Sequence, residues 1–176
     1  MAVERDANKR ERRMIEIGGG CQCGAVRYTL AGRRAVYACH CRECQRQSGS
    51  AFALSLPVPR DQLALTGALA VWTRAADSGA RSECSFCVVC GTRVHHASTT
   101  SPDWVTIKAG TLDDTRDLLP FAHLWVRSRQ PWVVLDPAVA RFDTQPADLA
   151  GWRQQVVALP TDQPLAARQA AVHKGE

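Results

Sequence analysis

The chain has 176 residues, of which 45% are apolar, and it carries a formal charge of +5. This length and composition allow one domain whose hydrophobic core needs no disulfide bonds. Residues 1–13 are charged and lack the apolar segment of a secretory signal, and no apolar run reaches the roughly 18 residues of a membrane span. We therefore expect a cytoplasmic protein that has no membrane partner and keeps its thiols reduced.

Short strands dominate the predicted secondary structure. Residues 1–14 lack periodicity and are expected to form a disordered lead. Alternating apolar residues with turns between them predict an all-β domain over residues 15–143. Pro57 and Pro59 are expected to end a strand, and residues 45–50 to form a turn. The strands are expected at 25–30, 35–38, 51–56, 63–66, 69–73, 104–108, 123–126 and 132–135.

One stretch near the C-terminus predicts a helix. Apolar residues recur there at intervals of three and four from Leu149 to Leu159, and Pro146 suits a first helical position. We expect a short C-terminal helix over residues 144–159 that packs on the β domain. The prolines that follow indicate a flexible tail over residues 160–176.

Eight cysteines carry the strongest signal in the chain. Because the compartment is expected to be reducing, closely spaced cysteines favour metal binding over disulfide bonds. Zinc is the metal that such thiolate sets prefer. The groups are Cys21 with Cys23, then Cys39, Cys41 and Cys44, then Cys87 with Cys90, while Cys84 stands alone.

Two of the groups have the form of half-sites for one metal ion. Cys87 and Cys90 are followed by a glycine, and so are Cys21 and Cys23. A glycine at this place permits the tight backbone turn that presents two sulfurs to one ion. The two pairs together predict a closed, structural four-cysteine zinc site. Because metal binding contributes directly to folding in such sites, this one is expected to stabilise much of the domain.

The three remaining clustered cysteines predict a different kind of site. Cys39, Cys41 and Cys44 offer three thiolates, which leave one of the four positions of a zinc ion open for chemistry. The second zinc brings the expected number to two per chain. The alternative is a closed site whose fourth ligand is His40, His95, His96 or Cys84. Cys84 is expected instead to be a small buried residue near the Cys87 turn.

The metal ions change the charge of the chain. Seven thiolates add seven negative charges and two Zn²⁺ ions add four positive ones, so the formal charge of +5 falls to about +2. The tryptophans show no spacing that follows a nucleic-acid strand. A nucleic-acid partner is therefore not expected, and the sequence does not predict an oligomeric state.

A longer pattern around the cysteines resembles one family. The pattern is Gly20-Cys21-x-Cys23-Gly24-x-Val26-x-Tyr28, then Cys39-His40-Cys41-x-x-Cys44 with Gly49-Ser50-x-Phe52, then Phe86-Cys87-x-x-Cys90-Gly91-Thr92. It is similar to the family of glutathione-dependent formaldehyde-activating enzymes, which includes centromere protein V. The resemblance extends over residues 16–142.

The resemblance implies a fold, two metal sites and an activity. The fold is a β-tent of antiparallel sheets. The metals are a structural zinc on Cys21, Cys23, Cys87 and Cys90, and a second zinc on Cys39, Cys41 and Cys44. The implied activity is that of a carbon–sulfur lyase, which reversibly joins glutathione and formaldehyde as S-hydroxymethylglutathione.

Two features bear on the substrate, and a second function stays open. The backbone N–H groups of Ser48, Gly49 and Ser50 are candidates for substrate binding beside the second zinc. Arginines are candidates for the carboxylates of glutathione. The alternative function, suggested by centromere protein V, is a non-catalytic zinc module that binds another protein. The candidate arginines are Arg42, Arg46, Arg127 and Arg129.

Overall fold

The computed structural model describes residues 16–31, 35–75, 79–116 and 118–158. The predicted lead at 1–14 and tail at 160–176 lie outside this part of the chain. Within it, no helix is both long and apolar enough to cross a membrane.

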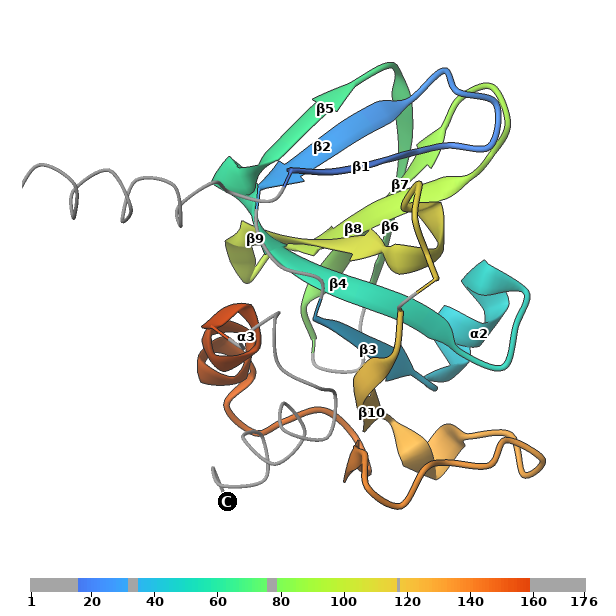
Figure 1. Ribbon diagram of the computed structural model, residues 1–176, viewed down its shortest axis with the longest axis vertical. Coiled ribbons are helices and arrows are strands. Elements are labelled where there is room, and N and C mark those ends of the chain that lie inside the picture. Colours follow the sequence, from blue (N-terminus) through green and yellow to red (C-terminus); the bar gives the residue numbers. More distant parts are fainter. Residues whose placement is uncertain (1–15, 32–34, 76–78, 117, 159–176) are drawn as a thin grey trace, which may run out of the picture.

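The described strands form a three-stranded sheet and an eight-stranded sheet (Figure 1). The small sheet has the order β1 (Glu16–Gly20), β2 (Arg27–Ala31) and β5 (Leu63–Thr66). The large sheet has the order β11 (Ala140–Phe142), β10 (Pro120–Leu124), β3 (Val36–Cys39), β4 (Ala53–Pro59), β9 (Ser101–Lys108), β8 (Arg93–Ser98), β7 (Arg81–Cys87) and β6 (Leu69–Ala75). The helices are α2 (Arg42–Ser48) and α3 (Leu149–Ala158), with short 3₁₀ turns at Arg60–Gln62, Ala109–Thr111 and Val126–Ser128.

The main hydrophobic core lies between the two sheets. Tyr28 and Leu30 of β2 pack in one cluster with Leu56 of β4 and with Val105 and Ile107 of β9. Burying an apolar side chain of this size contributes roughly 1.5–3 kcal/mol to folding. Figure 1 shows the small sheet at the top of the view, with α2 and α3 lower, beyond β4.

The opposite face of the large sheet is polar. Residues that alternate with the core positions point to this face, because successive side chains of a strand lie on opposite sides. Ser55 pairs with Lys108, and His96 pairs with Cys84 on the next strand. Ser55, Lys108 and Cys84 are all buried. Burying polar side chains costs free energy, so we interpret this buried polar face as a functional site and not as part of the hydrophobic core.

Helix α3 closes one end of this polar face. The backbone N–H of Gly151 donates to Oδ1 of Asp148 at 2.9 Å, which caps the first turn of the helix. Trp152 is buried and packs edge-on against Tyr37, with 5.3 Å between the ring centroids. It also lies against Phe121 and Phe142. These aromatic contacts fix α3 on the domain.

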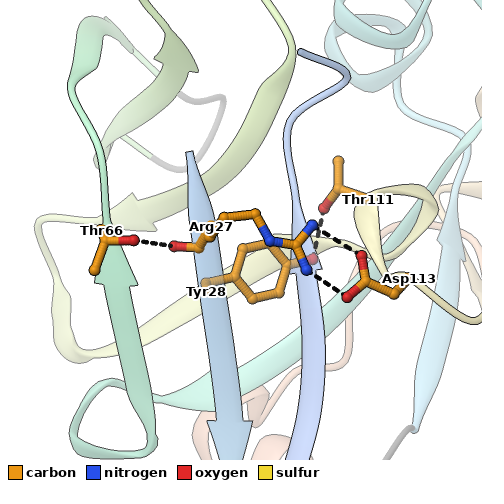
Figure 2. Close-up of polar contacts among 5 residues, drawn as sticks. All are labelled: Arg27, Tyr28, Thr66, Thr111 and Asp113. Carbon is orange, nitrogen blue, oxygen red and sulfur yellow. Dashed lines mark hydrogen bonds and ion pairs between the residues drawn. The ribbon is translucent and has the colours of Figure 1, made fainter. Parts of the chain in front are cut away.

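A polar link joins the small sheet to the segment after β9 (Figure 2). Arg27 donates two hydrogen bonds to Asp113, at 2.9 and 2.5 Å, and the hydroxyls of Tyr28 and Thr111 lie 2.7 Å apart. Thr66 donates to the backbone oxygen of Arg27. Because the ion pair is about half exposed, we expect it to contribute no more than about 1 kcal/mol. Its main consequence is to hold residues 109–113 against β2.

The all-β fold class with a short C-terminal helix is confirmed, and most strand pairs are antiparallel, with one exception. Strand β10 runs parallel to both β3 and β11. Between β3 and β10 the chain passes through β4 to β9, which provides the long crossover that parallel neighbours need. The β-tent arrangement itself stays a prediction.

Several local expectations are corrected. Pro57 and Pro59 do not end their strand, since β4 continues to Pro59. Strand β3 pairs with β4 only up to Ser55, so the prolines lie where β4 has a neighbour on one side only. The predicted turn at residues 45–50 is largely helix, because α2 extends from Arg42 to Ser48.

Two further corrections concern the C-terminal third. Residues 132–135 form no strand, and Trp132 and Val134 are exposed. The Arg129 guanidinium donates to the backbone oxygen of Val133, which holds this segment as a loop. Helix α3 begins at Leu149, later than Pro146, because the carboxylate of Asp148 supplies the cap.

We predict that Trp152→Ala lowers the free energy of unfolding by about 3–5 kcal/mol, because it removes a buried aromatic side chain. Urea denaturation of the metal-loaded protein measures this change. Trp132→Ala is the matched control, since that side chain is 69% exposed, and it should cost less than about 1 kcal/mol. Equal losses from the two substitutions would contradict the described packing of α3.

Candidate metal centres and their cavity

Four cysteines converge from opposite ends of the core. The sulfurs of Cys21, Cys23, Cys87 and Cys90 all lie within 4.8 Å of one another. Sγ of Cys23 is 3.4 Å from that of Cys21 and 3.8 Å from that of Cys87. Four sulfurs bound at ~2.3 Å to a tetrahedral zinc lie roughly 3.8 Å apart, so the donor set fits this metal. No disulfide is present, since all eight cysteines are free.

Each pair of this group sits on a turn that ends at a glycine with positive φ. The N–H of Gly24, at φ 80°, donates to the oxygen of Cys21, and that of Gly91, at φ 70°, donates to the oxygen of Cys87. A residue with a Cβ is strained in this conformation, which explains the glycine after each pair. Backbone N–H groups of Val26 and Val89 donate to sulfurs of the group. Such bonds favour the thiolate form that a metal requires.

Thr92 prepares one of these thiols for ionisation. Its hydroxyl lies 3.2 Å from Sγ of Cys90, and this hydrogen bond, with help from the backbone, lowers the pKa of Cys90 to about 5. At neutral pH the group therefore holds at least one thiolate before a metal arrives. A metal ion then displaces the protons of the other thiols.

The second group is presented by the end of β3 and the first turn of α2. The sulfurs of Cys39, Cys41 and Cys44 lie within 4.8 Å of one another. Cys41 is the N-cap of α2, and its sulfur accepts the N–H of Cys44 at 3.3 Å. The helix starts here because Cys41 satisfies a free N–H of the first turn. The group is the centre of a small cluster with Ala53, Tyr37 and Trp125.

The three thiols titrate together. Hydrogen bonds from Cys39 and then Cys41 hold the pKa of Cys44 well below its usual range. Hydrogen bonds with Cys41 and then Cys44 hold the pKa of Cys39 well above its usual range. One of the three thiols thus loses its proton readily. The other thiols keep their protons until a bound cation compensates the negative charge of the group. This behaviour is typical of thiols arranged for a metal.

None of the candidate fourth ligands joins this group among the described residues. His40 is fully buried, and its Nε2 lies 3.0 Å from Nδ1 of His123. Burial lowers the pKa of His40 to about 4, so the ring is neutral at pH 7. His96 lines the cavity described below, whereas His95, its neighbour on β8, does not. His123 is a buried histidine with a hydrogen-bond partner.

Cys84 is buried as expected, but its surroundings are polar. Its sulfur accepts a hydrogen bond from Nη2 of Arg93 at 3.2 Å and lies 3.6 Å from Oε1 of Gln47 on α2. It belongs to neither cysteine group. The contact with Gln47 shows that α2 extends over the polar face from the three-cysteine group towards β7.

A cavity of about 1060 Å³ opens over the three-cysteine group. Its walls include Trp125, whose backbone has φ 62°, an uncommon conformation for a bulky residue that is frequent at functional sites. The Arg127 guanidinium lies 4.9 Å from the centre of the Trp125 ring. The lining has two carboxylates, Glu43 and Asp148, against six guanidinium groups. These are Arg42, Arg46, Arg74, Arg81, Arg127 and Arg153.

The cavity separates the remaining candidates for substrate binding. Ser48, Gly49 and Ser50 form the end of α2 and its cap, and they do not line the cavity. Arg129 also lies outside it and bonds to the backbone of its own loop. Arg42, Arg46 and Arg127 do line it. The sequence did not identify Arg74, Arg81 or Arg153 as cavity residues. They lie in two strands and a helix, and local sequence patterns do not show that these elements meet at one cavity.

The family model that matches this chain agrees with these observations. A family model described as glutathione-dependent formaldehyde-activating enzyme matches residues 16–128. A crystal structure of a Rhodobacter sphaeroides protein is similar, with 23% identity, a TM-score of 0.46, and coverage of 57% of this chain and 91% of that chain. The chain has no match among curated proteins. Because the family model spans more than half of the chain and includes all seven clustered cysteines, the chain belongs to the glutathione-dependent formaldehyde-activating enzyme family.

Proposed function

We propose that this protein is a zinc-dependent carbon–sulfur lyase that forms and breaks the adduct of a glutathione-like thiol with a small aldehyde. One observation carries the proposal. Three cysteines without a fourth protein ligand among the described residues lie at a large cavity rich in arginine. Three ligands and an open position are typical of catalytic rather than structural zinc.

The two cysteine groups are assigned different roles. Cys21, Cys23, Cys87 and Cys90 would hold a structural zinc, and Cys39, Cys41 and Cys44 a second one. A zinc ion held by these three thiolates would act as a Lewis acid that keeps a substrate thiol ionised at neutral pH. The hydrogen bond from the backbone N–H of Cys44 to the sulfur of Cys41, which caps α2, would help to hold the three sulfurs in place for this ion.

The reaction itself moves few atoms. The substrate sulfur would attack the carbonyl carbon, so that a carbon–sulfur bond forms while the π bond of the carbonyl breaks. The oxygen receives that electron pair and takes up the proton that the thiol has lost. The reverse reaction breaks the same bond and regenerates thiol and aldehyde. The cavity wall at Trp125 and Tyr37 excludes water from one side of the reacting atoms, which strengthens the electrostatic interactions there.

The cavity supports an anionic thiol of some size. A small thiol and formaldehyde need far less space than about 1060 Å³. Glutathione carries two carboxylates and one ammonium group, and guanidinium groups bind carboxylates in a two-point geometry. Arg153 is half-buried and takes part in none of the ion pairs among the described residues. It is our first candidate for a substrate carboxylate.

The alternative, a non-catalytic zinc module, has less support. It requires a closed second site with four protein ligands, and the described residues supply three. A module of this kind would bind a protein partner whether or not thiols are present. The tests below separate the two functions.

We predict two zinc ions per chain and a strong loss of stability in Cys87→Ser. Structural zinc contributes several kcal/mol or more to folding, so the thermal midpoint should fall by at least about 10 °C. Metal analysis and thermal unfolding measure both quantities. Cys84→Ser is the matched control and should retain both ions, since Cys84 lies in neither group. Loss of one ion in Cys84→Ser would contradict the assignment.

We predict that Cys41→Ser reduces adduct formation from glutathione and formaldehyde by at least about 100-fold while the chain stays folded on its structural zinc. The rate is measured by following the adduct with zinc-loaded protein. Cys84→Ser should keep most of the activity. An undiminished rate in folded Cys41→Ser would exclude the three-cysteine group as the reaction centre.

We predict that Arg153→Gln raises KM for glutathione about 10-fold, because one charge-assisted hydrogen bond to a carboxylate is lost. The rate with 2-mercaptoethanol, which has no carboxylate, should not change. Initial rates with both thiols test this. A parallel loss with the two thiols would indicate damage to the cavity instead of lost recognition.

A further inference from the structure

Two buried cations on the polar face of the large sheet have no acidic partner within the described part of the chain. Lys108 and Arg93 are 8% and 9% exposed. Nζ of Lys108 donates to Oγ of Ser55 at 3.3 Å, and Nη2 of Arg93 donates to Cys84. Neither takes part in an ion pair found among the described residues, and Nε and Nη1 of Arg93 have no hydrogen-bond partner. A buried cation is costly unless a negative charge compensates it.

The strand register places Lys108 beside the three-cysteine group. Lys108 pairs with Ser55, and Ser55 pairs with Tyr37 on β3. Directly paired residues point to the same face, and Cys39, two residues after Tyr37, points there too. Helix α2 covers this face from Cys44 to Gln47, which contacts Cys84 on β7. Strand β9 lies between β4 and β7 in the sheet, so Lys108 lies beneath the helix.

The groups that face Lys108 come from four elements. Burial lowers the pKa of Lys108, and the nearby sulfur of Cys44 on α2 acts in the opposite direction. Arg93 on β8 adds to the lowering, whereas Cys39 on β3 and Cys84 on β7 oppose it. Sulfur atoms of three cysteines are thus the groups that would favour the charged form of Lys108.

With Cys84 counted as the neutral thiol that donates to Gln47, the charges of the metal centre, Lys108 and Arg93 balance in only one state. A divalent ion with three thiolates carries a net charge of −1, and a fourth thiolate makes it −2. Lys108 and Arg93 together supply two positive charges. A thiolate as fourth ligand thus leaves the buried region neutral, whereas a neutral fourth ligand leaves one uncompensated cation. Low dielectric surroundings make this difference large.

We propose that Lys108, together with Arg93, is a positioning residue that makes the three-cysteine centre select a thiolate over a neutral molecule as its fourth ligand. The inference rests on the proposed function and names the chemical state of its substrate. In this proposal, Lys108 and Arg93 act through their charge and contact neither the aldehyde nor the carboxylates of the thiol. This role would also account for the position of the two buried cations beside the thiols of the three-cysteine group.

The test compares two small probes that differ in charge when bound. 2-Mercaptoethanol binds a metal as a thiolate, and imidazole binds it as a neutral molecule. The full-length protein is loaded with Co²⁺, whose absorption bands report both ligands. In Lys108→Met the affinity for 2-mercaptoethanol should fall about 10- to 100-fold, while that for imidazole changes less than about threefold. Lys108→Arg, which keeps the charge, should resemble the wild type for both probes.

Each outcome decides something. A parallel loss for both probes, or no loss for either, would overturn the role of Lys108 and leave the proposed function untouched. A wild-type protein that holds two Co²⁺ ions but binds no thiol would overturn the proposed function, and this inference with it. Lys108→Gln serves as a second neutral variant if the methionine variant does not fold. Equal Co²⁺ content and circular dichroism spectra establish that the variants are comparable.

Discussion

The convergence of Cys21 and Cys23 with Cys87 and Cys90 is the constraint on which the domain depends. It joins residues 64 positions apart, and it connects the start of the small sheet with the end of β7 in the large one. A contact between such distant residues costs considerable chain entropy, which a metal bond can offset in one step. The glycine turns on both sides make the convergence possible, because each presents two sulfurs without distorting its strand.

Once the sheets are joined, the two faces of the large sheet take different roles. One face packs against the small sheet and supplies the hydrophobic core. The other face would be exposed to water without α2 and α3, yet Ser55, Lys108 and Cys84 are buried there. Core packing and site chemistry are therefore separated by the alternation of the same strands. We therefore expect a substitution at Val105 or Ile107 to act on stability and one at Lys108 to act on the site.

The cysteine groups could be predicted from the sequence because their spacing is short and their chemistry is specific. Most strands were also predictable, since Tyr28 and Leu30 or Val105 and Ile107 alternate with polar neighbours. Helix α2 was not, because seven residues with few apolar positions have no visible period and its cap is a cysteine. The parallel pairing of β10 depends on a crossover between distant segments, which local patterns do not encode.

The buried cations mark the limit of such reasoning. Alternation in residues 104–108 puts Lys108 on the face opposite to Val105 and Ile107, but it does not reveal that α2 covers that face. A lysine at the end of a strand is usually exposed, and only strand order brings this one beneath the cysteines. Among the described residues it takes part in no ion pair, and ionised thiols beside it would compensate its charge. Under the proposed function, a structural zinc would organise the domain, and the charge on the second set of sulfurs would then account for the burial of the polar face.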